Sequence, residues 1–131
     1  MVSVDTNIIF RLLTQDDEQQ YRKSFELFQT QNIFIPDTVI LETEWVLRFA
    51  YQFQPDEICQ AFRDLFGLPN VYLTNANAIV QVLQWHENGL DFADAFHLAQ
   101  SYNCSAIYPF DEKFLKRAKN FSTQCEVKQP D

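Results

Sequence analysis

Short runs of β-forming residues alternate with helical segments along the chain, and this alternation most limits what it can fold into. Strand-like runs occur at residues 2–4, 33–35, 71–73 and 105–108, and a last edge strand is expected at 124–127. Amphipathic or apolar helical patterns fill the intervals. Such alternation is typical of an α/β fold, and we predict a short, mostly parallel central sheet of four to five strands flanked by helices.

The sequence indicates a single domain. No repeat, low-complexity run or linker interrupts its 131 residues, so we expect one domain over residues 1–131. No targeting segment is visible, and no run approaches the roughly 20 apolar residues needed to span a bilayer. Cys59, Cys104 and Cys125 are odd in number and widely spaced among apolar neighbours, so we expect buried, reduced thiols in a cytoplasmic protein with no membrane contact.

Charge is unevenly distributed. The formal net charge of −8 argues against a protein that grips nucleic acid through a broadly positive surface. Residues 64–112 contain no lysine or arginine, whereas five of the ten fall within the last twenty-one residues. An acidic centre beside a basic terminus fits a metal site whose ions supply part of the neutralisation, and it also fits a merely acidic protein.

The segment at residues 89–99 places two aspartates at the start of a helix of small and apolar residues. Gly89 can end the preceding helix in a left-handed conformation, and Asp91 can cap the next one. Asp94 closes a capping-box-like pair, but its apolar neighbours leave the helix little polar surface of its own. A carboxylate in such a setting needs a partner, and a metal ion is one candidate. His97, three residues later, is either packed or hydrogen-bonded near Asp94.

Three further carboxylates belong to the same edge of the predicted fold. Asp5 and Asp111 each follow a strand directly, and ligands of open α/β sheets collect at the carboxyl ends of strands. Glu42 lies in the helix that follows the second strand. Together with Asp94 these groups would repel one another without a divalent cation, and oxygen-only ligands suit Mg²⁺ or Mn²⁺. The simpler alternative gives Asp5 and Asp111 turn or N-cap roles and leaves Glu42 facing solvent.

Four motifs carry a resemblance over the whole chain. They are Val4-Asp5-Thr6-Asn7, the stretch from Leu41 to Leu47 containing Glu42, the stretch from Asp91 to Ala99, and Phe110-Asp111-Glu112-Lys113-Phe114. In this order and spacing the chain resembles the PIN-domain family and, more narrowly, the VapC-like toxins of prokaryotic toxin–antitoxin pairs. The resemblance implies a single PIN-like domain that acts as a metal-dependent endoribonuclease.

The resemblance also implies roles for particular residues. Asp5, Glu42, Asp94 and Asp111 would be the catalytic acids, and Asp5, Asp94 and Asp111 would bind Mg²⁺ or Mn²⁺. Asn7 and Asp91 would be accessory groups. The family often has Thr or Ser two residues before its last acid, whereas this chain has Pro109, which offers neither a hydroxyl nor an N–H.

The partners implied by the resemblance are an RNA substrate, a small antitoxin protein and a second copy of the chain. An acidic pocket is suited to receive an arginine of such an antitoxin. The apolar side chains of two helices indicate a protein interface, at Phe49, Tyr51, Phe53, Phe62 and Phe66. Two rival interpretations remain open, a PIN-like binding module that cleaves nothing and a metal-dependent phosphohydrolase of small molecules.

Overall fold

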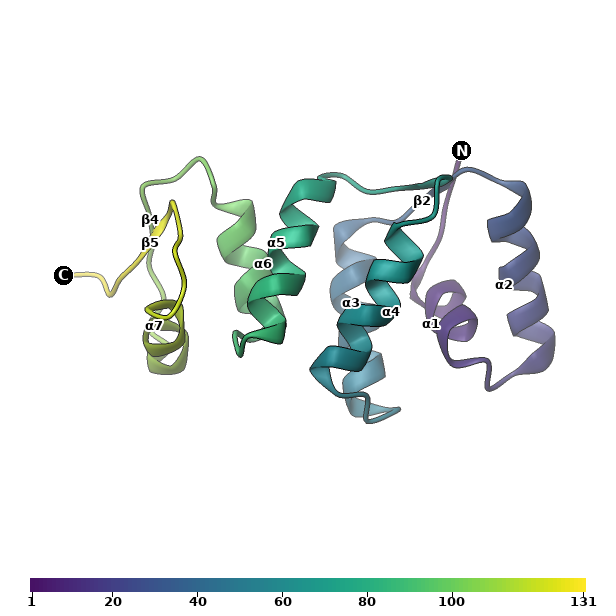
Figure 1. The fold of residues 1–131 in the computed structure, drawn as a ribbon, viewed down its shortest axis with the longest axis horizontal. Helices are drawn as coiled ribbons and strands as arrows, with labels where there is room; N and C mark the ends of the chain where they lie inside the picture. The colour runs from purple at the N-terminus through teal and green to yellow at the C-terminus, as the bar shows by residue number, and fades with distance from the viewer. The chain divides into compact units, whose positions relative to one another are not determined.

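A computed structural model describes all residues, 1–131, as two compact units, Met1–Thr74 and Asn75–Asp131. The first unit contains β1 (Val2–Ser3), α1 (Thr6–Thr14), α2 (Glu18–Thr30), β2 (Ile33–Phe34), α3 (Asp37–Phe49), α4 (Pro55–Phe66) and β3 (Val71–Tyr72). The second contains α5 (Ala76–Glu87), α6 (Phe92–Gln100), β4 (Ala106–Ile107), α7 (Glu112–Ala118) and β5 (Glu126–Val127) (Figure 1). No helix is long and apolar enough to cross a membrane.

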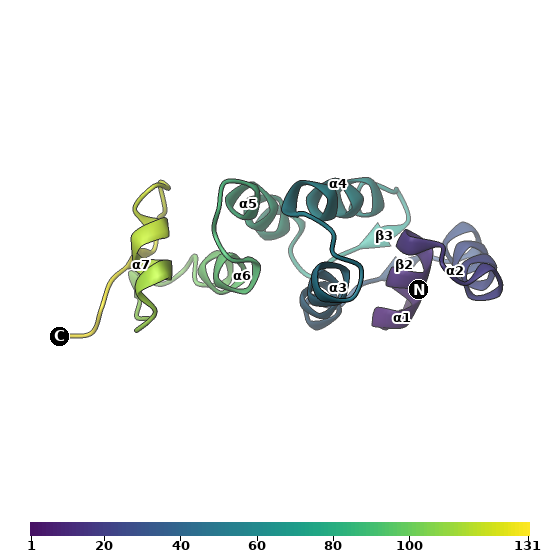
Figure 2. The ribbon, with the colours of Figure 1, turned by 90° about the horizontal axis from the view of Figure 1, so that it is seen from below.

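The first unit is built on a parallel three-stranded sheet in the order β1-β2-β3. Val2 aligns with Ile33, and Ile33 aligns with Val71. Figure 2 shows α4 on one side of β2 and β3, with α1 and α3 on the other. The strands therefore lie between helices, and Ile33 and Ile35 are almost completely buried.

The helices of the first unit begin and end as local sequence cues predict. The side chains of Asp5 and Asp17 accept hydrogen bonds from the first-turn amides of α1 and α2. Helix α4 has Pro55 at its first position and a capping box between Gln54 and Glu57. Their apolar faces bury Ile9, Phe28, Ile40, Leu47, Ile58, Phe62 and Leu65.

The second unit is centred on the pair of helices α5 and α6, whose packing is the most extensive between any two elements. Helix α5 is capped by Asn75, whose side chain accepts a hydrogen bond from the Ala78 amide at 3.0 Å. The buried faces contribute Ile79, Val82, Leu83, Leu90, Phe92, Phe96 and Leu98. Strands β4 and β5 pair in parallel, with Ala106 aligned to Glu126.

The predicted α/β class, with parallel strands flanked by helices, is confirmed, but the strands are grouped differently from the prediction. The sequence predicts one central sheet, whereas three strands pair in the first unit and two in the second. Each strand is two residues long. Strands this short carry little pattern, so sequence predicts their presence better than their partners. The single domain over residues 1–131 stays a prediction.

Two predictions about side-chain burial are corrected. Cys59 and Cys125 are buried as expected, but Cys104 is exposed because it lies in the turns after α6. The apolar surface predicted on α3, α4 and their connection is mostly absent. Phe62 is fully buried and Tyr51, Phe53 and Phe66 are half-buried, because α4 turns its apolar face inward. Of the five predicted side chains only Phe49 is exposed, and its ring centroid lies 4.9 Å from that of the exposed Trp45, with the two rings tilted by 49°.

Candidate acidic site

Asp5 lies where β1 ends and α1 begins. Its backbone is extended, with φ −97° and ψ 179°, and its Oδ1 accepts from the Ile8 amide at 3.3 Å. The side chain is exposed. The N-cap role weighed from sequence is therefore present. An ionised carboxylate offers about four acceptor positions, so capping one amide leaves capacity for a cation.

A contact between α1 and α3 brings Glu42 to Thr6, the residue that follows Asp5. The hydroxyl Oγ1 of Thr6 donates a hydrogen bond to Oε1 of Glu42. Thr6 directly follows Asp5 and is buried, whereas the Glu42 side chain is exposed. The structure thus links Glu42 to the residue that follows Asp5, and Asn7, the next residue of α1, is exposed.

In the second unit, the connection between α5 and α6 places two acids. The amides of Gly89 and Leu90 donate to the carbonyls of His86 and Trp85, at 3.1 and 3.0 Å, which is a Schellman motif. Gly89 has φ +110°, so the left-handed ending predicted for it is confirmed. The turn is further held by the buried His86 ring, whose Nδ1 lies 2.8 Å from the Leu90 carbonyl oxygen.

Asp91 caps α6 and Asp94 lies in its first turn. Oδ2 of Asp91 accepts from the Asp94 amide at 3.2 Å, so the predicted cap is present. The Asp94 side chain is half-buried. Its pKa is raised above the ordinary value, first by burial and then by the negative charges of Asp91 and Asp111. The negative charges of Asp91 and Asp111 therefore act on the Asp94 carboxylate.

Asp111 caps α7 in the same unit. Its Oδ1 accepts from the Lys113 amide at 2.9 Å, and its side chain is exposed.

The charges of His97 and Arg117 oppose the effect of Asp91 and Asp111, because they act to lower the pKa of Asp94. His97 is exposed, which corrects the expectation of a packed histidine. Helix α6 buries Phe96 and Leu98 instead and directs residue 97 to solvent.

The acids thus form two groups, Asp5 with Glu42 in the first unit and Asp91, Asp94 and Asp111 in the second. Neither unit by itself holds three or more His, Cys, Asp or Glu side chains placed to bind one metal ion. The chemistry of the donors nevertheless suits Mg²⁺ or Mn²⁺, since every candidate ligand is a carboxylate oxygen. The raised pKa of Asp94 marks a negative charge that a cation would offset.

Sequence reasoning overlooked residues that support these acids. Thr6 is given no role of its own by the motif analysis, yet its hydroxyl holds the Glu42 carboxylate. A hydroxyl directly after a candidate ligand is the sequence signal for this role. Glu44, two residues after Glu42, is 3% exposed and pairs with Arg48, with Nε to Oε2 at 2.7 Å. The spacing of four residues between Glu44 and Arg48 is the available signal for this ion pair.

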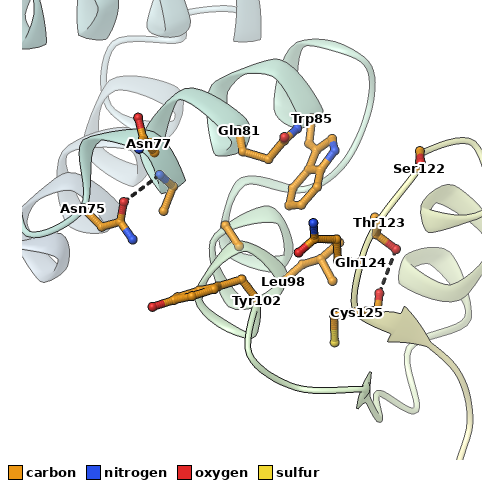
Figure 3. A pocket seen from close by; sticks show the side chains of 12 residues that line it. Asn75, Asn77, Gln81, Trp85, Leu98, Tyr102, Ser122, Thr123, Gln124 and Cys125 are labelled. Carbon is orange, nitrogen blue, oxygen red and sulfur yellow. Dashed lines mark hydrogen bonds between the residues drawn. The ribbon is translucent and has the colours of Figure 1, made fainter.

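A cavity of about 650 Å³ lies elsewhere in the second unit (Figure 3). Its lining contains carboxamides, two aromatic rings and hydroxyls but no charged side chain, and it includes Trp85, Tyr102, Gln124 and Cys125. Burial, with a smaller effect of Cys104, raises the pKa of the Cys125 thiol. None of the candidate acids lines this cavity.

Comparison with known protein families matches residues 2–120 to the PIN domain. The chain belongs to the PIN-domain family. No curated protein and no solved structure matches the chain. PIN domains are typically nucleases that act on nucleic acid and use divalent metals, and the match spans all five predicted site carboxylates. The roles of individual residues in this PIN domain remain predictions.

Proposed function

We propose that this PIN domain is a Mg²⁺- or Mn²⁺-dependent endoribonuclease that hydrolyses RNA phosphodiester bonds. The observation that carries the proposal is the half-buried Asp94 carboxylate, whose pKa is raised by burial and by Asp91 and Asp111. Without a cation, an ionised carboxylate whose pKa is raised by folding lowers the stability of the folded state. A cost of this kind is characteristic of functional sites.

In this proposal the catalytic acids are Asp5, Glu42, Asp94 and Asp111, and the metal ligands are Asp5, Asp94 and Asp111. A divalent ion held by these three carboxylates would supply neutralisation of charge at the scissile phosphate and activation of a water. Glu42, held by the Thr6 hydroxyl, orients the attacking water as a base. Asn7 and Asp91 are accessory groups, and Asp91 acts by fixing the first turn of α6.

The proposed setting is a toxin–antitoxin pair in the cytoplasm, with the chain acting as one domain and as a homodimer. An antitoxin arginine would satisfy the excess negative charge around Asp94 in place of the metal. The exposed pair Trp45 and Phe49, 56% and 57% exposed, supplies an apolar contact in the first unit for a protein partner. Exposed aromatic rings are common anchors of protein interfaces.

The deciding experiment is cleavage of RNA, with Mg²⁺ or Mn²⁺ titrated in, by the antitoxin-free chain and its variants. Asp5→Asn and Asp94→Asn should each reduce cleavage on the order of 100-fold or more. Asp17→Asn is the matched control for Asp5→Asn, because Asp17 also caps a helix, accepting from the Gln20 amide at 3.0 Å. Cleavage that survives both site variants would exclude these acids as the catalytic centre.

A second readout is independent of activity. Mg²⁺ should raise the melting temperature of the unaltered chain, because a ligand that binds only the folded state stabilises it by about 2.7 kcal/mol at a hundred times its Kd. Asp94→Asn should abolish most of this rise, whereas Asp17→Asn should retain it. A metal-dependent rise in both variants alike would assign the ion to another place.

A catalytically weak PIN-like binding module is the second candidate. Two observations favour it: Pro109 stands before Asp111 where a hydroxyl is expected, and neither unit alone assembles three metal ligands. Pro109→Thr and Pro109→Ala separate the candidates. An increase in cleavage with Thr but not Ala would indicate a weakened nuclease, and no RNA cleavage by any variant would favour the binding module. Hydrolysis of a simple phosphate ester without RNA cleavage would indicate a small-molecule phosphohydrolase.

A further inference from the structure

Three cations of the second unit share one exposed helix face. Lys113, Lys116 and Arg117 are exposed and share a face of α7, at spacings of three and four residues. The opposite face is buried through Phe114 and Ala118. The burial pattern therefore fixes the three charges toward solvent, and Lys119 follows at the end of the helix.

Three of the five cations of the first unit form ion pairs. Arg11 pairs with Asp16 at 2.8 Å, Arg22 pairs with Glu18 at 2.5 Å, and Arg48 pairs with Glu44 at 2.7 Å. Lys113, Lys116, Arg117, Lys119 and Lys128 form no ion pair. The chain has a net charge of −8, so acidic side chains outnumber basic ones. A shortage of acids therefore does not explain why these cations form no ion pair. A local group of unpaired cations is suited to an anionic partner.

Two aromatic rings lie next to these charges in the chain. Tyr108 and Phe110 precede α7 and are 57% and 81% exposed. The Lys128 Nζ lies 5.6 Å from the centroid of the Tyr108 ring. Rings this exposed contribute little to a core, and together with cations they form the combination that binds single-stranded nucleic acid.

We propose that residues 108–119 together with Lys128, the 108–119 surface, bind single-stranded RNA. Bases stack on Tyr108 and Phe110, while phosphates contact the cations of α7 and Lys128. The inference rests on the proposed nuclease function and specifies the form of its substrate, because stacking on protein rings requires unpaired bases. Asp111 lies within the segment, so a strand held here has its phosphates beside a candidate ligand.

The test is fluorescence anisotropy of a labelled 12-nucleotide single-stranded RNA with the full chain in EDTA, where metal-dependent cleavage is suppressed. Phe110→Ala and Tyr108→Ala should each raise the Kd about fivefold or more. Phe25→Ala is the control, because Phe25 is an exposed ring of α2, 43% exposed, that belongs to no proposed interface. It should leave the Kd unchanged.

The charges are tested by salt dependence. Lys116→Gln combined with Arg117→Gln should lower the slope of log K against log salt by about 1.4, since each phosphate contact to a single strand contributes about 0.7. Lys23→Gln is the control, as an exposed lysine in α2. A duplex of the same sequence should bind more weakly than the single strand and should not respond to the aromatic variants.

Several results would overturn the inference. These are no single-strand binding by the unaltered chain, unchanged Kd values in the 108–119 variants, or preferential binding of a poly-glutamate peptide, which would indicate an acidic protein partner. If the chain cleaves RNA while these variants bind normally, the surface is wrong and the nuclease proposal stands. If the surface binds RNA but the chain cleaves none, the surface stands and the nuclease proposal fails.

Discussion

The hydroxyl of Thr6 donates a hydrogen bond to the carboxylate of Glu42, 36 positions away in the chain. It joins the turn after β1 to the middle of α3. Thr6 is buried, whereas Glu42 is exposed, so a fixed group in the interior orients a carboxylate at the surface. The bond also joins Glu42 to the residue that follows Asp5, its proposed partner in catalysis.

We predict that Thr6→Val, which replaces the hydroxyl with a methyl group, lowers the free energy of unfolding by about 1 kcal/mol. It should also reduce RNA cleavage, because Glu42 loses its orientation. Thr6→Ser should retain most of both properties, since the donor remains. Chemical denaturation and a cleavage assay measure the two effects. Equal losses in the Val and Ser variants would point to packing of the methyl group instead.

The ion pair of Glu44 and Arg48 supports α3 from its buried face. Arg48→Met leaves the buried Glu44 carboxylate without the guanidinium, and we expect a loss of about 1–3 kcal/mol in unfolding free energy. The lower part of this range allows for the partial exposure of Arg48, at 37%. The double variant Glu44→Leu with Arg48→Met should be more stable than Arg48→Met alone in urea denaturation. If it is not, the Arg48 stem rather than the charge provides the stability.

Asp94 should make stability depend on pH. Its pKa is raised in the folded state from the ordinary value of 3.8, so the unfolded chain ionises more readily. Ionised Asp94 therefore destabilises the fold above its raised pKa, and this cost disappears as the pH falls through that value toward 3.8. Asp94→Asn should melt at a higher temperature than the unaltered chain at pH 7 in EDTA. A lower melting temperature for the variant at pH 7 would contradict the assignment.

Asp16 shows the opposite shift. Hydrogen bonds from Tyr51, at 2.5 Å, and from Arg11 lower its pKa to about 2. This contribution to stability is present above 3.8 and is lost as the pH falls through about 2. Tyr51→Phe should raise the Asp16 pKa toward 3.8, because the tyrosine hydroxyl is the largest cause of the shift. NMR titration of the carboxyl carbon measures it, with Tyr21→Phe as control.

Much of the fold follows from short-range signals. Asp5, Asp91 and Asp111 cap helices where the sequence predicts caps, and Gly89 adopts its positive φ. These features depend on a residue and its next three or four neighbours, so the local sequence contains the information. The same holds for Pro55 at the start of α4.

The burial of the side chains around the site is harder to predict from the sequence. Glu42 and Glu44 lie two residues apart on one helix, and their local sequence does not distinguish which of them is buried. The helix turns through about 200° between them, so one is exposed and the other is 3% exposed. Which of the two is buried depends on the packing of α3 against its neighbours. His97 follows the same rule, because α6 buries Phe96 and Leu98 instead.

The sequence by itself determined the α/β alternation, the helix caps and the chemistry of the acidic residues, because each is encoded by side chains that are neighbours in the chain. Only the tertiary structure decided that Thr6 holds Glu42, that Glu44 is buried with Arg48, and that β1 pairs with β2 while β4 pairs with β5. These contacts depend on how the apolar faces of α1, α3 and α6 are buried. Burial is set by the whole fold rather than by any local stretch.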